Sequence, residues 1–188
     1  MISHRSEKTI TCTIVGDGMV GKTTICQTFA GKSACEDYKA TVTDEFTVKT
    51  RVMGDKYMIR IIDSSGQHDY GDIRKRSYKD TDVFIVCYNV TDRDSFESIE
   101  GFWMSEIRKL CKKTPIILVA TGIDSIDEKD NVSKEEGLMI MNKCGVDAYV
   151  ECETNNKDQV AELFEDALLS VKSRKRRRSS LLHSLIHR

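Results

Sequence analysis

Short apolar runs alternate with longer stretches of helical spacing along most of the chain. The apolar runs are rich in β-branched residues and too apolar to have one wet face, which predicts strands covered on both sides. The predicted strands are Lys8–Val15, Phe46–Met53, Tyr57–Ile62, Val83–Asn89, Ile116–Ala120 and Ala148–Cys152. The stretches with apolar residues every three or four positions predict helices over Lys22–Ala30, Ser95–Leu110, Lys134–Cys144 and Gln159–Lys172.

The alternation of strands and helices predicts parallel pairing, because parallel strands need crossover connections. Gly54-Asp55 lies between the second and third strands, a connection too short for a crossover, so these two strands should form an antiparallel hairpin. We therefore expect an α/β fold. It should be a six-stranded, mainly parallel sheet with one antiparallel edge strand, flanked by about five helices, with a ligand at the carboxyl ends of the strands.

A length of 188 residues predicts one domain. We expect residues 1–7 to be an N-terminal extension, residues 8–171 to be the domain and residues 172–188 to be a tail. No stretch approaches about 18 uncharged apolar residues, and the start lacks the apolar core of a secretory signal, so we expect an intracellular protein. The seven cysteines are scattered without CxxC pairs, which predicts reduced thiols rather than zinc or redox sites.

Charge is distributed unevenly between the predicted domain and the tail. Residues 172–188 contain seven Lys or Arg and no acid, so residues 1–171 carry 22 basic and 30 acidic groups, a net charge of −8. An acidic body with a basic tail predicts an anionic partner for the tail and no nucleic-acid partner for the domain.

Directly after the first predicted strand, residues 16–23 read GDGMVGKT and run into a predicted helix. They fit the pattern G-x-x-x-x-G-K-[ST] of the phosphate-binding loop of P-loop NTPases. Such glycines let consecutive backbone N–H groups and the positive end of a helix approach an anion. A glycine turn that only precedes a helix would not need the lysine and the hydroxyl at this spacing. The expected nucleotide-binding residues here are Gly16, Asp17, Gly18, Met19, Val20, Gly21, Lys22, Thr23 and Thr24, with Lys22 at the outer phosphates and Thr23 as a magnesium ligand.

A phosphate loop alone leaves kinases and ATPases open, but DSSGQ follows the third predicted strand. With this segment the chain resembles the Ras superfamily of small GTPases, which has D-x-x-G-Q at this place. The resemblance implies that Asp63 holds magnesium indirectly and that the Gly66 amide senses the third phosphate. It also implies that Gln67 orients the attacking water.

Two residues of the loop before the second strand match further positions of this family. Thr41 lies 19 residues after Lys22 and 22 before Asp63, the intervals at which the family places its first-switch threonine. The resemblance makes Thr41 a second magnesium ligand when the third phosphate is present, and Tyr38 a nucleotide-binding residue. A threonine in a polar loop is otherwise an ordinary loop residue.

The segments GDGMVGKTT, SYKDTDVFIVCYNV, SFESIEGFW and PIILVA resemble the Rho and Rac branch, over roughly residues 8–171. The chain departs from that branch because only 28 residues separate Asp124 from Glu153, which leaves no room for the helical Rho insertion. Rho-like proteins also usually end in a prenylated cysteine. The last cysteine here is Cys152, so we expect no prenylation.

The family reads guanine with N-K-x-D, and this chain has Thr121-Gly122-Ile123-Asp124. The resemblance implies that Asp124 still accepts hydrogen bonds from the base, whereas Thr121 should be too short to copy the bridging asparagine. Glu153-Thr154-Asn155 replaces the family's S-A-K segment, and Ala34 stands where an aromatic ring usually stacks on the base. We expect these changes to weaken binding by about two to three orders of magnitude.

The resemblance thus implies an atypical Rho-like GTPase that binds GTP or GDP with Mg²⁺ and hydrolyses GTP slowly, with Gln67, Lys22 and Thr41 as catalytic residues. The alternatives are a pseudo-GTPase that serves as an interaction module and a protein for another base or reaction class. Effectors and regulators are expected to read Tyr38–Thr47 and Gly66–Tyr78. The tail combines a basic cluster, Lys172 and Arg174–Arg178, with the apolar residues Leu181, Leu182, Leu185 and Ile186. This combination predicts a peripheral location on the cytoplasmic face of an anionic membrane. The alternatives are a solvated tail and a nuclear-import signal.

Overall fold

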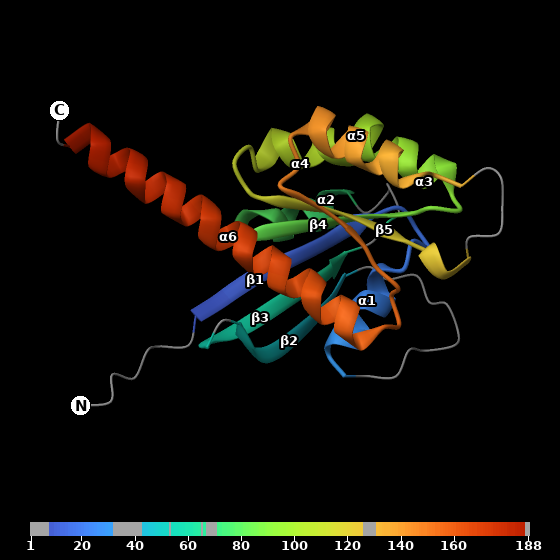
Figure 1. Cartoon of the computed structure of the whole chain (residues 1–188), viewed down its shortest axis with the longest axis horizontal. Coiled ribbons are helices and arrows are strands. Elements are labelled where there is room, and N and C mark those ends of the chain that lie inside the picture. Colours follow the sequence, from blue (N-terminus) through green and yellow to red (C-terminus); the bar gives the residue numbers. More distant parts are fainter. Residues whose placement is uncertain are drawn as a thin grey trace.

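The computed structural model describes residues 8–31, 43–52, 54–64, 66, 71–125 and 131–186, and only the backbone of residue 125 and of residues 177–186 (Figure 1). Its sheet has the order β2-β3-β1-β4-β5-β6. The β2–β3 pair is antiparallel and the other four pairs are parallel, which confirms the predicted fold class. The strands are β1 Lys8–Gly16, β2 Thr43–Val52, β3 Asp55–Ser64, β4 Val83–Asn89, β5 Ile116–Thr121 and β6 Ala148–Glu151.

Helices lie in the connections between these strands, except that β2 and β3 form a hairpin and the last helix follows β6. They are α1 Lys22–Phe29, α2 Gly71–Ser77, α3 Arg93–Ser98, α4 Met104–Leu110, α5 Lys134–Cys144 and α6 Lys157–Ile186, with short 3₁₀ turns η2 Tyr78–Asp80 and η4 Ile123–Ser125. A π-helical segment, η3 Ile99–Trp103, joins α3 to α4, so the helix predicted over Ser95–Leu110 is continuous but not uniform. Apolar spacing did not predict α2, because this short helix is mostly charged and its Ile73 is exposed.

The helices cover both faces of the sheet (Figure 1). On one face, α1 and α6 contribute Ile25, Leu163 and Phe164 to a core with the inward side chains of β1, β3 and β4. On the other face, α3, η3 and α4 contribute Phe96, Trp103 and Ile107 to a second core beneath α5. Burial on both faces explains why the central strands read as continuous apolar runs.

Helix α6 runs past the sheet without a break at the predicted boundary between residues 171 and 172 (Figure 1). Arg174 donates from Nε and Nη2 to the two carboxylate oxygens of Asp147, both at 2.9 Å, and from Nη1 to the Lys113 carbonyl oxygen. Lys175 Nζ lies 3.5 Å from Asp82 Oδ1, and Lys172 Nζ lies 3.9 Å from Asp55 Oδ2. Lys172, Arg174 and Lys175 of the basic tail are therefore docked on the acidic domain.

None of the helices in the described part of the chain combines the length and apolar character that crossing a bilayer requires.

Helix α5 begins with a reciprocal cap that also ties it to α3. The Ser133 side chain accepts from the Glu136 N–H, and the Glu136 carboxylate accepts from the Ser133 N–H at 2.9 Å. Arg93 donates to the same carboxylate at 2.8 Å. This cap fixes the start of α5 beside the loop that follows β4.

Glu136→Gln is expected to lower the free energy of unfolding at pH 7 by about 0.3 to 1 kcal/mol, because the Arg93 pair is partly exposed. The Arg93 guanidinium and the Ser133 N–H hold the pKa of Glu136 at about 2, below its ordinary 4.5. A carboxylate with a depressed folded-state pKa stabilises above its ordinary pKa, and this contribution is lost as pH falls from about 4.5 towards 2. Urea unfolding of both proteins should show the difference at pH 7 shrinking near the lower end of that window. A pH-independent difference would contradict this account of the cap.

Candidate functional site

The predicted phosphate loop connects β1 to α1 at the carboxyl edge of the sheet. Gly16 and Gly21 have φ values of 139° and 87°, which favour glycine. A Cβ on Gly16 would also lie 2.2 Å from the Cys87 carbonyl oxygen of β4. No side chain caps the start of α1, and its first turn carries no acid. The backbone N–H groups of this helix end are thus suited to an anion.

Lys22 lies buried at the first position of α1, and Thr24 follows it on the same helix. The Lys22 Nζ donates to the Asp17 carbonyl oxygen at 2.5 Å. Burial lowers the pKa of Lys22, while Cys87 and Asp63 nearby act in the opposite direction. The ammonium group is therefore held against the backbone of the loop, where an anion bound by the loop would offset its desolvation.

Thr23 on α1 meets Asp63 at the end of β3. The Thr23 hydroxyl donates to Asp63 Oδ2 at 2.6 Å, and Asp63 is fully buried. Burial raises the pKa of Asp63, partly offset by the Thr23 hydrogen bond. Its Oδ1 is buried without a hydrogen-bond partner among the described residues. A hydroxyl and a carboxylate oxygen fit the ligand preference of Mg²⁺, and a cation would compensate the unsatisfied oxygen.

Within the described ranges, His, Cys, Asp and Glu side chains form no cluster of three or more that could hold a metal ion.

The segment after β3 approaches the phosphate loop at Gly66. A Cβ on Gly66 would lie 2.4 Å from the Asp17 carbonyl carbon and 2.5 Å from the Gly18 nitrogen. Only glycine fits this contact between backbones. The structure thus brings Gly66 to the phosphate loop, as the D-x-x-G-Q resemblance implies.

Thr121, at the end of β5, contacts the phosphate loop through its side chain. Its buried hydroxyl lies 2.9 Å from the carbonyl oxygens of both Val20 and Tyr88, so it bridges the phosphate loop and β4. These contacts hold the loop and β4, whereas the expectation concerned the role of the family's asparagine in reading the base, and it stays a prediction. The bridge is possible because Gly21 passes close by: a Cβ on Gly21 would lie 3.9 Å from the Thr121 Cβ.

The other base-reading positions differ in their surroundings. Gly122 has a φ of 71°, and a Cβ there would lie 2.2 Å from Asn89 Oδ1, so a side chain is disfavoured. Asp124 lies exposed on η4. Thr154 packs beside Gly21. Its carbonyl oxygen accepts a hydrogen bond from the Thr28 hydroxyl at 2.8 Å. The loop after β6 therefore supports the phosphate loop.

Four residues of the sequence analysis lie outside the described residues: Ala34, Tyr38, Thr41 and Gln67. The geometry therefore brings together Gly16–Thr23, Asp63, Gly66 and Thr121, with Asp124 at the surface beyond them.

Sequence reasoning missed a second set of side chains that reaches the same loop. Trp103 Nε1 donates to Asp17 Oδ1 at 2.7 Å, and the Arg74 guanidinium lies 4.7 Å from the Trp103 ring centroid. Arg74 is buried and donates to both Glu106 carboxylate oxygens, at 2.9 and 3.0 Å. Trp103 is the sole tryptophan of the chain, a signal that could have drawn attention to it.

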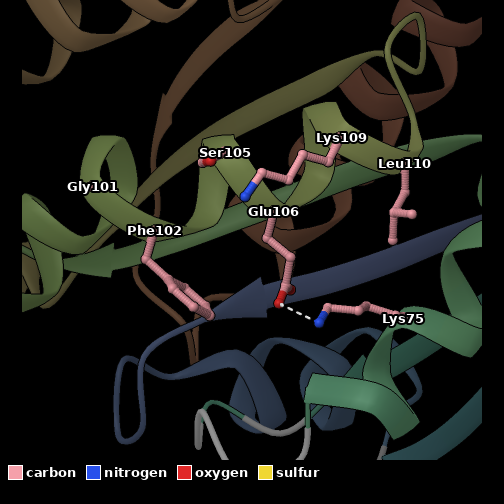
Figure 2. A pocket seen from close by; sticks show the side chains of 7 residues that line it. All are labelled: Lys75, Gly101, Phe102, Ser105, Glu106, Lys109 and Leu110. Atoms are coloured by element: carbon pink, nitrogen blue, oxygen red, sulfur yellow. Dashed lines mark ion pairs between the residues drawn. The ribbon is translucent and has the colours of Figure 1, made fainter.

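A groove of about 400 Å³ lies between α2 and the η3–α4 helix (Figure 2). It is lined by Lys75, Gly101, Phe102, Ser105, Glu106, Lys109 and Leu110. Lys75 and Glu106 face each other across it at 4.0 Å. The groove shares Glu106 with Arg74, which donates to this carboxylate.

The arrangement of the phosphate loop, the Thr23–Asp63 pair and Gly66 agrees with a comparison against known protein families. The chain matches the model of the Ras family over residues 11–173. The match begins within β1, spans the whole sheet and ends within α6. Because it covers most of the sequence, the chain belongs to the Ras family of small guanine-nucleotide-binding switches.

Proposed function

We propose that this chain is an atypical Rho-like GTPase that binds GTP and GDP with Mg²⁺ and hydrolyses GTP slowly. The observation that carries the proposal is the Thr23–Asp63 pair beside the buried Lys22. A buried carboxylate with one unsatisfied oxygen and a buried ammonium are costly in a domain that only has to fold. Both are useful where a metal ion and phosphates bind.

The proposed reaction is in-line attack of water on the third phosphate, which yields GDP and inorganic phosphate. Lys22 offsets negative charge on the phosphates, and Gln67 orients the water. Thr23 and Asp63, joined by Thr41 in the triphosphate state, would hold magnesium, which supplies further positive charge when bound. The Gly66 N–H would contact the third phosphate, and the close approach of the Gly66 backbone to the loop supports this role.

Slow turnover is expected from the surroundings of the two described arginines that lie seven residues from Gln67 in the sequence, Arg60 and Arg74. Arg60 on β3 pairs with Glu45 of β2. Arg74 is buried, paired with Glu106 and stacked on Trp103. It is therefore committed to the helix packing and does not act as a built-in arginine finger. An activating partner that supplies an arginine is expected to accelerate hydrolysis.

The Rho-like assignment rests on the sequence segments quoted above, and the altered base pocket makes the protein atypical. Thr121 keeps the bridge to Val20, whereas Gly122 has no stem to cover a base. Asp124 can still accept hydrogen bonds from guanine, which adenine cannot donate in the same form. We therefore expect weak selectivity and fast nucleotide exchange.

The alternative function is an interaction module with little turnover. The departures at Gly122 and in Glu153-Thr154-Asn155 favour it, because they weaken base recognition. The buried Lys22 and Asp63 favour the GTPase, since neither is needed for packing.

Partners are proposed to contact Tyr38–Thr47 and Gly66–Tyr78. Support comes from α2, whose Ile73 is 43% exposed, and from the adjacent groove with the exposed Leu110 (Figure 2). An exposed apolar side chain next to a groove is typical of protein contact sites.

The tail is proposed to bind an anionic membrane surface on the cytoplasmic side, with nuclear import as the alternative. Lys172, Arg174 and Lys175 are docked on the domain, so the membrane proposal rests on the other three residues of the basic cluster, Arg176–Arg178. At about 1 kcal/mol each, they would contribute roughly 3 kcal/mol before ordering costs. Helical backbone through Ile186 supports a shared apolar face for the leucines that follow.

Lys22→Ala is expected to abolish binding of GTP and GDP, because the loop loses its buried positive charge. Lys134→Ala, which removes a surface ammonium paired with Glu151, is the matched control and should bind as wild type. Fluorescent-nucleotide titration measures both. Unchanged affinity in Lys22→Ala would refute the phosphate-loop assignment.

Gln67→Leu is expected to slow GTP hydrolysis while leaving nucleotide binding nearly intact, because leucine keeps the volume but cannot orient water. Single-turnover hydrolysis with saturating enzyme isolates this step. Equal rates for the two proteins would exclude Gln67 from the mechanism.

Replacing Arg176–Arg178 with alanine is expected to abolish binding to anionic vesicles at low salt. Replacing Lys172, Arg174 and Lys175 removes the same charge but should leave more binding, since these residues are docked on the body. Co-sedimentation with anionic and neutral vesicles compares the two triple variants. Equal loss in both, or no binding of wild type to anionic vesicles, would contradict the proposal.

A further inference from the structure

Asp17 is held from three directions although it belongs to a loop. Its side-chain Oδ1 accepts from Trp103 Nε1 at 2.7 Å, and its carbonyl oxygen accepts from Lys22 Nζ at 2.5 Å. Its backbone is in contact with Gly66, where a Cβ would lie 2.4 Å from the Asp17 carbonyl carbon. The Lys22 and Gly66 contacts belong to the phosphate site already described, whereas the Trp103 contact comes from outside it.

The π-helical segment η3 places this tryptophan. Its wider turn lets two consecutive aromatic residues, Phe102 and Trp103, pack edge to face with ring centroids 5.0 Å apart. Phe102 lines the groove beside α2, and Trp103 is fully buried with its indole N–H at Asp17. Single π turns inside α-helices are frequent at functional sites.

Arg74 holds the outer side of the indole. Its guanidinium lies over Trp103 and Phe102, at 4.7 and 5.7 Å from the ring centroids. Both oxygens of Glu106 accept from it, and Tyr78 donates to the same carboxylate at 2.8 Å. The side chains of α2 and η2 are therefore packed against the group that reaches the phosphate loop.

We propose that Trp103 is a positioning residue that braces Asp17, and with it the phosphate loop, and that Arg74 carries the position of α2 to this brace. The proposal rests on the proposed nucleotide binding and names a part of the chain that regulates it. Asp17 supplies the carbonyl oxygen beside Lys22 and precedes Gly18, so a shift of its side chain moves backbone that faces phosphate. A displacement of α2 by a partner would thus change the rate of nucleotide release.

The competing explanation is that Trp103 only fills the core. Trp103→Phe separates the two, because phenylalanine keeps an aromatic ring in the core and removes the N–H donor. Tyr149→Phe is the matched control, because it also removes a polar group from a ring packed on the same core. Among the described residues, the hydrogen bonds of the Tyr149 hydroxyl are with Tyr88 and Glu151 rather than with the loop.

Release of bound GDP is the first measurement. We expect Trp103→Phe to release GDP about tenfold faster than wild type. This is the change in rate expected when one hydrogen bond to a charged, partly exposed group is lost. Tyr149→Phe should release GDP at the wild-type rate. In an Asp17→Ala background, Trp103→Phe should add little, because the acceptor is already gone.

The second measurement uses the nucleotide-free protein. With one tryptophan in the sequence, its ¹⁵N NMR spectrum contains a single indole N–H resonance. Asp17→Ala should shift this resonance and speed its exchange with water. Arg74→Lys, which keeps the charge but loses the two-pronged pairing, should shift it as well.

An indole resonance unmoved by Asp17→Ala, or a wild-type release rate in Trp103→Phe, would overturn the brace while leaving the proposed function intact. An indole resonance unmoved by Arg74→Lys would overturn the link to α2. Failure of the wild-type protein to bind any nucleotide would instead refute the proposed function, and the phosphate role of Trp103 with it.

Discussion

The site depends on a close approach of backbones that leaves no room for a Cβ. Gly16 passes the carbonyl oxygen of Cys87 where a Cβ would be 2.2 Å away, and Gly66 meets Asp17 at a similar separation. These contacts bring β1, β4 and the segment after β3 together at one edge of the sheet. Phosphate recognition can then use backbone N–H groups, while Lys22 and Asp63 lie buried beneath the loop.

The two halves of the proposed nucleotide site are built differently. On the phosphate side, hydrogen bonds of 2.5–2.9 Å connect Lys22, Thr23 and Thr121 with the loop and with Asp63. On the base side, Asp124 is exposed, and Gly122 has a backbone conformation and a neighbour, Asn89, that both disfavour a side chain. The buried Lys22 and the Thr23–Asp63 pair of the phosphate side are not needed for packing alone. The contrast supports the proposal that the chain binds phosphate and selects its base weakly.

Most of the fold could be predicted because strands buried on both faces read as apolar runs and the phosphate loop has a fixed pattern. Helix α2 could not be predicted, since its stability comes from buried Arg74 and Tyr78 rather than from an apolar stripe. The Thr121 bridge and the docking of Arg174 on Asp147 depend on distances between residues far apart in the sequence. Patterns along the chain carry no such distances, so neither contact can be predicted from the sequence.

The central claim is that this chain binds guanine nucleotides through magnesium and the phosphate loop. The most direct measurement is equilibrium titration of the purified protein with labelled GTP, GDP and ATP, with Mg²⁺ and with excess chelator. The account predicts magnesium-dependent binding of GTP and GDP and much weaker binding of ATP. Absence of nucleotide binding would contradict the claim and favour an interaction module, and equal binding of ATP would contradict guanine recognition by Asp124.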